Sequence, residues 1–122
     1  MTLSLPYYYG HEAEQYAFFR IPKMLLTDDR FAGISSDAKL LYGLLLDRME
    51  LSVRNGWLDD QNRVYIVFTT EEVMSTLHCR SEKAARLFAE LDGKKGIGLI
   101  ERKRLGLGKP SLIYVKNFAS AL

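Results

Sequence analysis

Basic side chains crowd into one segment of this sequence, residues 78–109, which holds nine Lys and Arg against four Asp and Glu. Lys and Arg neutralise phosphates, and both can donate hydrogen bonds to the O6 and N7 atoms of guanine. The formal net charge is only +2, but residues 1–60 carry six basic and nine acidic side chains, whereas residues 61–122 carry eleven and six. The asymmetry is compatible with a nucleic-acid surface and with an ordinary solvated face.

Two glycine patterns in this segment superficially suit phosphate binding by an enzyme. Gly106–Lys109 resembles the end of a P-loop, but Lys103 and Pro110 stand where that motif needs Gly and Ser or Thr. Gly96–Gly98 is followed by Glu101 where a dinucleotide-binding fingerprint needs a third glycine. Neither motif is complete.

His78 and Cys79 are adjacent, but no second Cys/His pair completes a tetrahedral metal site, and His11 is isolated. We interpret the pair as a turn histidine and a partly buried cysteine, and Asp59 and Asp60 as turn formers. We therefore expect no catalysis, no metal and no cofactor.

The sequence also indicates the cellular compartment of the protein. Its apolar runs, such as Leu44–Leu46, fall far short of the roughly 20 residues of a membrane span, and residues 1–6 do not have the regions of a secretory signal. A single cysteine, Cys79, cannot form an intrachain disulfide, which fits a reducing environment. We expect a cytoplasmic protein that does not contact membranes.

The first long helix is predicted to begin after an N-cap at Ser35 and to end at Asn55-Gly56. Apolar residues recur in it at three- and four-residue spacing, as on the inner face of a helix. These are Ala38, Leu41, Tyr42, Leu45 and Met49.

Two further helices are predicted downstream. The first starts at the capping box Thr69-x-x-Glu72 and runs to Leu77, and the second is capped by Ser81 and ends at 92–96. The inner stripe of the second consists of Ala84, Leu87, Phe88 and Leu91.

Strands are predicted at 64–68, 98–105 and 112–116, the last two forming a hairpin with a glycine-rich loop. The order of helix, strand, short helix, tight turn, basic helix and basic hairpin is that of a winged helix-turn-helix. The expected fold class is α+β, with three main helices, a C-terminal hairpin wing and an aromatic N-terminal arm. As a single structural domain it divides into an N-terminal arm and short helix that pack on the domain (1–34), the winged-helix DNA-binding domain (35–118) and a tail (119–122).

Six of the chain's 14 aromatic residues lie between positions 7 and 19 of the arm. Pro22 is predicted to open a short helix through Leu26. The arm either folds over the domain's own core or reaches a partner subunit, and clustered aromatic residues favour a homodimer interface if they are exposed. The six are Tyr7, Tyr8, Tyr9, Tyr16, Phe18 and Phe19.

The N-terminal end of a recognition helix is the part that reaches base edges in the major groove. We expect Arg80, Lys83 and Arg86 to make these contacts, with Ser81 and Glu82 supporting them. The outer face of this helix is expected to present Glu82, Lys83, Arg86 and Glu90. The alternative is a solvated amphipathic helix with an ion pair between Glu82 and Arg86.

In the hairpin, Arg102 and Arg104 alternate onto one face and Lys109 lies at the tip. A cationic hairpin can follow phosphates or enter the minor groove, so these three side chains are further candidates. Lys94 and Lys95 are weaker phosphate candidates. The alternative is an edge hairpin whose charges prevent aggregation.

Several segments together resemble the N-terminal domain of the plasmid replication initiator A (RepA) family, which occurs in low-GC Gram-positive plasmids and mobile elements. The resemblance extends from about Tyr7 to Phe118. Its segments are Tyr7–Gln15, Phe19–Lys23, Asp37–Met49, Asn55–Trp57, Gly96–Arg104 and Gly106–Pro110.

The resemblance implies a winged helix that binds repeated double-stranded sites, iterons, at a replication origin, and implies dimers that pair origins. It also implies host replication proteins as partners of a C-terminal region that this sequence does not contain. A winged-helix transcriptional regulator and a protein-interaction module of the replication machinery remain alternatives.

Overall fold

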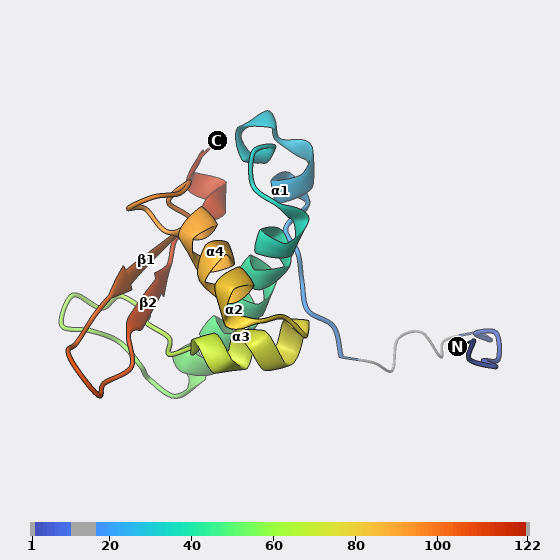
Figure 1. Ribbon diagram of the computed structural model, residues 1–122, viewed down its shortest axis with the longest axis horizontal. Helices are drawn as coiled ribbons and strands as arrows, with labels where there is room; N and C mark the ends of the chain where they lie inside the picture. Colours follow the sequence, from blue (N-terminus) through green and yellow to red (C-terminus); the bar gives the residue numbers. More distant parts are fainter. Residues whose placement is uncertain (1, 11–16, 122) are drawn as a thin grey trace.

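The computed structural model describes residues 2–10 and 17–121. Helices and 3-10 turns pack beside a two-stranded antiparallel sheet, which lies at one side of the body (Figure 1). In chain order the elements are α1 (Lys23–Thr27), η2 (Asp29–Phe31), α2 (Ser36–Arg54), α3 (Thr70–Leu77), α4 (Ser81–Leu91), β1 (Ile100–Lys103), β2 (Leu112–Val115) and η3 (Phe118–Ala121).

The long helix α2 has the predicted ends. The Ser35 hydroxyl accepts a hydrogen bond from the Ala38 amide at 3.1 Å, and Gly56 takes a φ of +72° just after the Asn55 C-cap. Glu90 of α4 reinforces this start, because its carboxylate accepts from the Ser35 amide at 2.7 Å and the Ser35 hydroxyl at 2.8 Å. Glu90 was predicted on the outer face of α4, but its carboxylate is bonded to the start of α2.

Helices α3 and α4 form the helix-turn-helix. The capping box of α3 is confirmed, with the Thr69 hydroxyl and the Glu72 carboxylate bonding reciprocally to backbone amides. His78 closes α3 in the left-handed conformation at φ +53°, which turns the chain into α4. The N-cap of α4 is Arg80, without a side-chain capping bond, so the predicted cap at Ser81 is wrong by one residue.

The hairpin pairs Ile100 with Val115 and Lys103 with Leu112. Its strands are shorter than predicted: the first run loses 98–99 and 104–105, and the second ends at Val115 instead of Lys116. The predicted strand at 64–68 is wrong as a regular strand. The run contains two isolated bridges. Ile66 exchanges two 2.9 Å backbone bonds with Ile113, and Val64 bridges back to Leu58.

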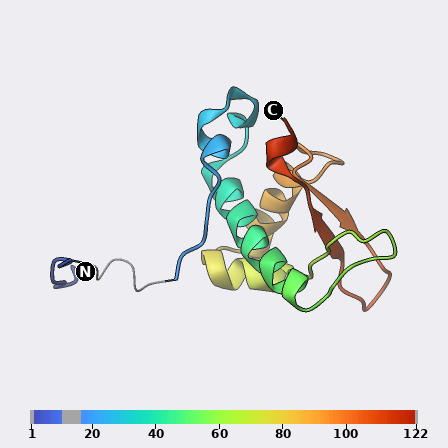
Figure 2. The same ribbon diagram turned by 180° about the vertical axis from the view of Figure 1, so that it is seen from behind.

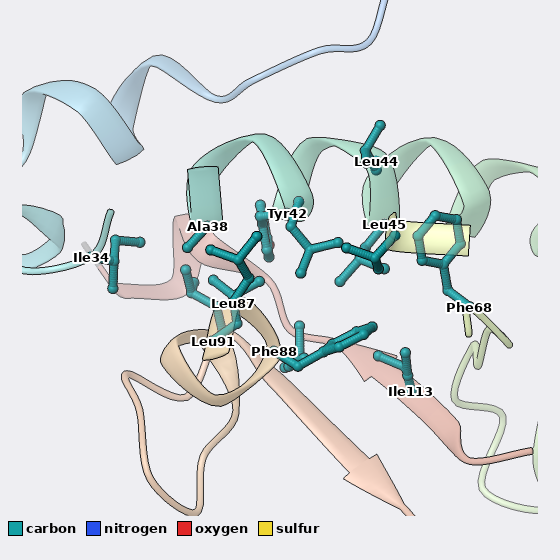
Figure 3. Packing of buried hydrophobic residues seen from close by; sticks show 14 of the residues in the cluster. Ile34, Ala38, Tyr42, Leu44, Leu45, Phe68, Leu87, Phe88, Leu91 and Ile113 are labelled. Carbon is teal, nitrogen blue, oxygen red and sulfur yellow. The ribbon is translucent and has the colours of Figure 1, made fainter. Parts of the chain in front are cut away.

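The core lies where α2 crosses α4 and meets β2 (Figure 3). All four predicted inner residues of α4 are buried, together with Leu41, Tyr42 and Leu45 of α2. The Tyr42 hydroxyl donates to the Lys116 carbonyl at 2.6 Å, and burial raises the pKa of this phenol to about 12. A winged helix-turn-helix with a hairpin wing is therefore the architecture of this chain.

The N-terminal segment packs on the body only from Ile21 onward. Leu25, Phe31 and Ile34 join the common core, and Pro22 is the N-cap of α1, not its first helical residue. Gly43 of α2 is buried beneath Ile21, since a Cβ on this glycine would overlap the Ile21 side chain.

The described aromatic residues of the arm are exposed, with Tyr7 at 83% and Phe18 at 70%. The described aromatic residues before Ile21 are therefore not folded into the core. Figure 2 shows the chain leaving the body beside α2 and extending away from it. Tyr16 lies outside the described residues.

Candidate nucleic-acid interface

The first cluster of candidate residues surrounds the N-terminal end of α4. Arg80, Glu82, Lys83 and Arg86 line a shallow depression of about 580 Å³ together with His78 and Cys79, and Ser81 is exposed beside them. The turn after α3 brings these side chains together, because His78 bends the chain back on itself. The depression is open to solvent on the face where a recognition helix offers base-contacting groups.

Ion pairing distinguishes the three cations of this cluster. Lys83 Nζ lies 2.6 Å from Asp37 Oδ2 in the first turn of α2. Within the described ranges, neither Arg80 nor Arg86 forms an ion pair, and the alternative Glu82–Arg86 pair is absent. The two arginines are therefore free to donate to an incoming ligand, whereas Lys83 must first break its ion pair with Asp37.

The second cluster lies between α4 and the wing. A groove of about 380 Å³ is lined by four of the predicted cations, Lys94, Lys95, Arg102 and Arg104, and by the small side chains of Ala85, Ala89 and Ser111. The strand alternation places Arg102 and Arg104 on the face of the wing that looks toward α4, as Ile100 does. The small α4 residues leave room in the groove.

Asp92 is the one acidic residue of this groove. It is 4% exposed and accepts from Arg102 Nε at 2.8 Å. Burial alone would raise the pKa of Asp92, but hydrogen bonds from Arg102 and from the Lys94 amide hold it below its ordinary value. Arg102 also covers the Phe88 ring at 5.1 Å. Arg102 therefore ties the wing to α4 as well as facing the groove.

The wing ends in a glycine-rich turn. The Lys109 amide donates to the Gly106 carbonyl at 3.2 Å, and Gly106 and Gly108 have φ angles of +123° and +75°. Such angles are accessible to glycine at little cost. Lys109 is exposed on this turn, apart from both clusters.

Residues 17–121 match the protein family described as "Replication initiator protein A (RepA) N-terminus". The chain belongs to this family.

Solved structures agree with this family assignment. One described as "N-Terminal domain of DNA binding protein" is 32% identical, with a TM-score of 0.70 over 93% of this chain and 85% of the other. Another, "Structure of Rep-DNA complex", is 32% identical, with a TM-score of 0.71 over 92% and 84%. A third, "Structure of MDR initiator", is 27% identical, with a TM-score of 0.70 over 92% and 86%.

A curated relative, a "41 kDa protein" of Lactobacillus helveticus, is 31% identical over 70 residues, which are 57% of this chain and 20% of the relative. The chain thus matches about a fifth of the length of that protein. No helix in the described part is long and apolar enough to cross a membrane, and no cluster of three metal-binding side chains occurs there.

Three site features of this family member were missing from the sequence prediction. Asp37 is the partner of Lys83, Asp92 is the partner of Arg102, and His78 with Cys79 lines the α4 depression. The two acidic partners had no local signal, because contacts across the fold decide them. The position of His78 in the turn was visible in the sequence, but its place beside the recognition cluster was not.

Proposed function

We propose that this chain binds duplex DNA sequence-specifically, at repeated iteron sites in the replication origin of a plasmid or mobile element. The observation that carries the proposal is the pairing of two cationic clusters, one at the N-terminal end of α4 and one between α4 and the wing. Family membership and a 32% identical neighbour solved as a "Rep-DNA complex" support it. The bound state then controls or initiates replication without catalysis by this domain.

In this proposal the N-terminal end of α4 enters the major groove. Arg80 and Arg86 are unpaired there and donate to guanine edges, and Lys83 joins them when it leaves Asp37. Ser81 and Glu82 contact neighbouring base edges or bridging water. Each bidentate arginine contact discriminates against a wrong base by about 1–3 kcal/mol.

The wing supplies contacts that do not depend on sequence. Lys94, Lys95, Arg102 and Arg104 face one groove and follow the phosphates beside the α4 site, and Lys109 reaches a phosphate or the minor groove from the tip. Asp92 keeps Arg102 oriented and reduces the net positive charge of the groove by one. This reduction limits indiscriminate binding while the outer cations remain available.

We further propose that the chain acts as a homodimer in the bacterial cytoplasm, where such DNA resides. The exposed aromatic residues of the arm are the proposed contact surface, because exposed apolar clusters mark interfaces. They are Tyr7, Tyr8, Tyr9, Phe18 and Phe19. Tyr16, which lies outside the described residues, is included in the proposed surface on the sequence alone. We also propose host replication proteins as partners in initiation.

Selection from a pool of random duplexes tests the DNA-binding proposal. We expect one motif to be enriched and to recur as direct repeats in the origin of the element that carries the gene. A motif found only in the promoter of that gene would instead support a transcriptional regulator. No enrichment, with no salt-dependent affinity for any duplex, would contradict DNA binding and favour a protein-interaction module.

A further inference from the structure

The tip of the wing carries a fully exposed leucine. Leu107 is 104% exposed, the highest value among the large hydrophobic side chains of the described residues. Figure 1 shows the loop between β1 and β2 projecting from the body, well away from α1. A single exposed leucine on a flat surface would need no explanation, but this one is held at the end of a projecting element.

The backbone presents this side chain in a defined way. Leu107 stands between Gly106 and Gly108, both with positive φ angles, and the Lys109 amide closes the turn on the Gly106 carbonyl. The turn thus places one apolar side chain at its apex, with cations on either side at Arg104 and Lys109. An apolar tip flanked by cations matches a duplex groove, which offers apolar base faces between two rows of phosphates.

We propose that Leu107 is a wedge that enters the minor groove, slides between two stacked base pairs and bends the DNA toward the major groove. This inference rests on the proposed DNA binding. Aliphatic side chains that partly unstack a base step bend duplexes in this way. The cations at Arg104 and Lys109 neutralise phosphates on either side of the step, while the leucine replaces stacking contacts with its own.

The wedge also predicts sequence preference at a position without a base hydrogen bond. Steps of pyrimidine followed by purine, TA and CA/TG, unstack and kink most easily. We therefore expect such a step in the selected motif under the wing. Its distance from the bases contacted by α4 is set by the rigid attachment of the wing through Arg102 and Asp92.

The test uses a short duplex with the selected motif, labelled at both ends for energy transfer and carrying 2-aminopurine at the flexible step. The variants are Leu107→Ala, Leu107→Met, and Leu26→Ala as a matched control, because Leu26 is an exposed leucine on α1. Wild type, Leu107→Met and Leu26→Ala should bend the duplex and raise the 2-aminopurine signal. Leu107→Ala should lose both effects and about tenfold in affinity, with an unchanged salt slope.

The outcomes separate the two proposals. If wild type binds the motif but neither bends it nor changes the 2-aminopurine signal, the wedge is overturned and DNA binding stands. Bending by Leu107→Ala equal to that of wild type also overturns the wedge. If wild type binds no duplex, both proposals are overturned.

Discussion

Lys83 has two competing partners, Asp37 in the free protein and a DNA base in the proposed complex. Its ammonium group is paired with Asp37 in the free protein, although both side chains are about two-fifths exposed, at 41% and 43%. Exposed pairs of this kind contribute about 0–1 kcal/mol, so a DNA base can displace the carboxylate at small cost. In the proposed complex, Asp37 therefore competes with DNA for Lys83.

We expect Asp37→Asn to raise affinity for the selected motif by up to about fivefold, because Lys83 no longer has to exchange partners. The measurement is a binding titration at fixed salt. Asp47→Asn is the control, since it changes the charge of α2 by the same amount at an exposed position without an ion pair in the described structure. An equal gain from both variants would show that only net charge matters.

The ionisation of Asp92 makes the free energy of unfolding depend on pH in acidic solution. Its pKa is below 3.8 in the folded state, so its stabilising contribution is complete above 3.8 and disappears as the pH falls through the folded value. We expect Asp92→Asn to lower the free energy of unfolding by about 1–3 kcal/mol near neutral pH, since Arg102 loses a charged acceptor. The difference from wild type should shrink below pH 3.8.

Urea titrations from about pH 7 down to the acid limit of folding measure this difference. Arg102→Met is the companion variant, because it removes the cationic partner and leaves the buried Asp92 with the Lys94 amide as its donor. It should destabilise the protein near neutral pH, and this loss should diminish in acid as Asp92 becomes protonated. A difference independent of pH in both variants would contradict the role of the ion pair.

Among the elements, the turn between α4 and the wing is the most tightly constrained. Gly96 packs against the end of α4 so closely that a Cβ would overlap the carbonyl oxygens of Glu90 and Ala89. The Gly96 amide also donates to the Asp92 carbonyl at 2.8 Å. This turn therefore fixes how the wing leaves the recognition helix.

We expect Gly96→Ala to destabilise the fold by at least about 2 kcal/mol, because backbone cannot yield as a side chain does. Thermal melts measure the loss, and DNA titrations should show reduced affinity for every duplex as the groove cations move. Gly93→Ala is the matched control in the same turn, since the nearest atom to its Cβ is 3.8 Å away. Equal melts for the two variants would refute the close approach.

The elements with local determinants could be predicted from the sequence. Ser35 and Thr69 start α2 and α3 through hydrogen bonds within a few residues, and the α4 stripe follows from helical periodicity. The 64–68 run could not be assigned correctly from the sequence. A regular strand needs a neighbouring strand along its whole length, and in this run only Ile66 bridges to the hairpin, at Ile113. The start of α4 was misplaced because Arg80 caps it without a side-chain bond.

The residues of the candidate site could be predicted from the sequence, but the ion pairs among them could not. Charge density and alternation placed Arg102 and Arg104 on one face, and both line the groove beside α4. Which cations are already paired depends on Asp37 and Asp92, which reach them across the tertiary fold.

At the scale of the whole molecule, the arm is joined to the body at one close crossing. Ile21 packs on Gly43, and the described aromatic residues before it are exposed. We expect Gly43→Ala to displace Ile21 from α2 and to speed tryptic cleavage after Arg20 several-fold, because local release controls access to the protease.

The control for the arm is Gly33→Ala, where a new Cβ meets nothing within 4 Å. If Gly43→Ala and Gly33→Ala are cleaved at the same rate as wild type, the crossing does not hold the arm. If the arm forms the proposed dimer, sedimentation should also show a weaker dimer for Gly43→Ala alone.

In the proposed complex, α4 sets the sequence preference and the wing binds phosphates. This division is tested most directly by binding titrations of Arg86→Ala and Arg104→Ala at several salt concentrations, on the selected motif and on a scrambled duplex. Arg86→Ala should reduce the preference for the motif about tenfold. Arg104→Ala should weaken both duplexes equally and lower the salt slope by about one. A lost preference in Arg104→Ala, or an unchanged preference in Arg86→Ala, would contradict this division.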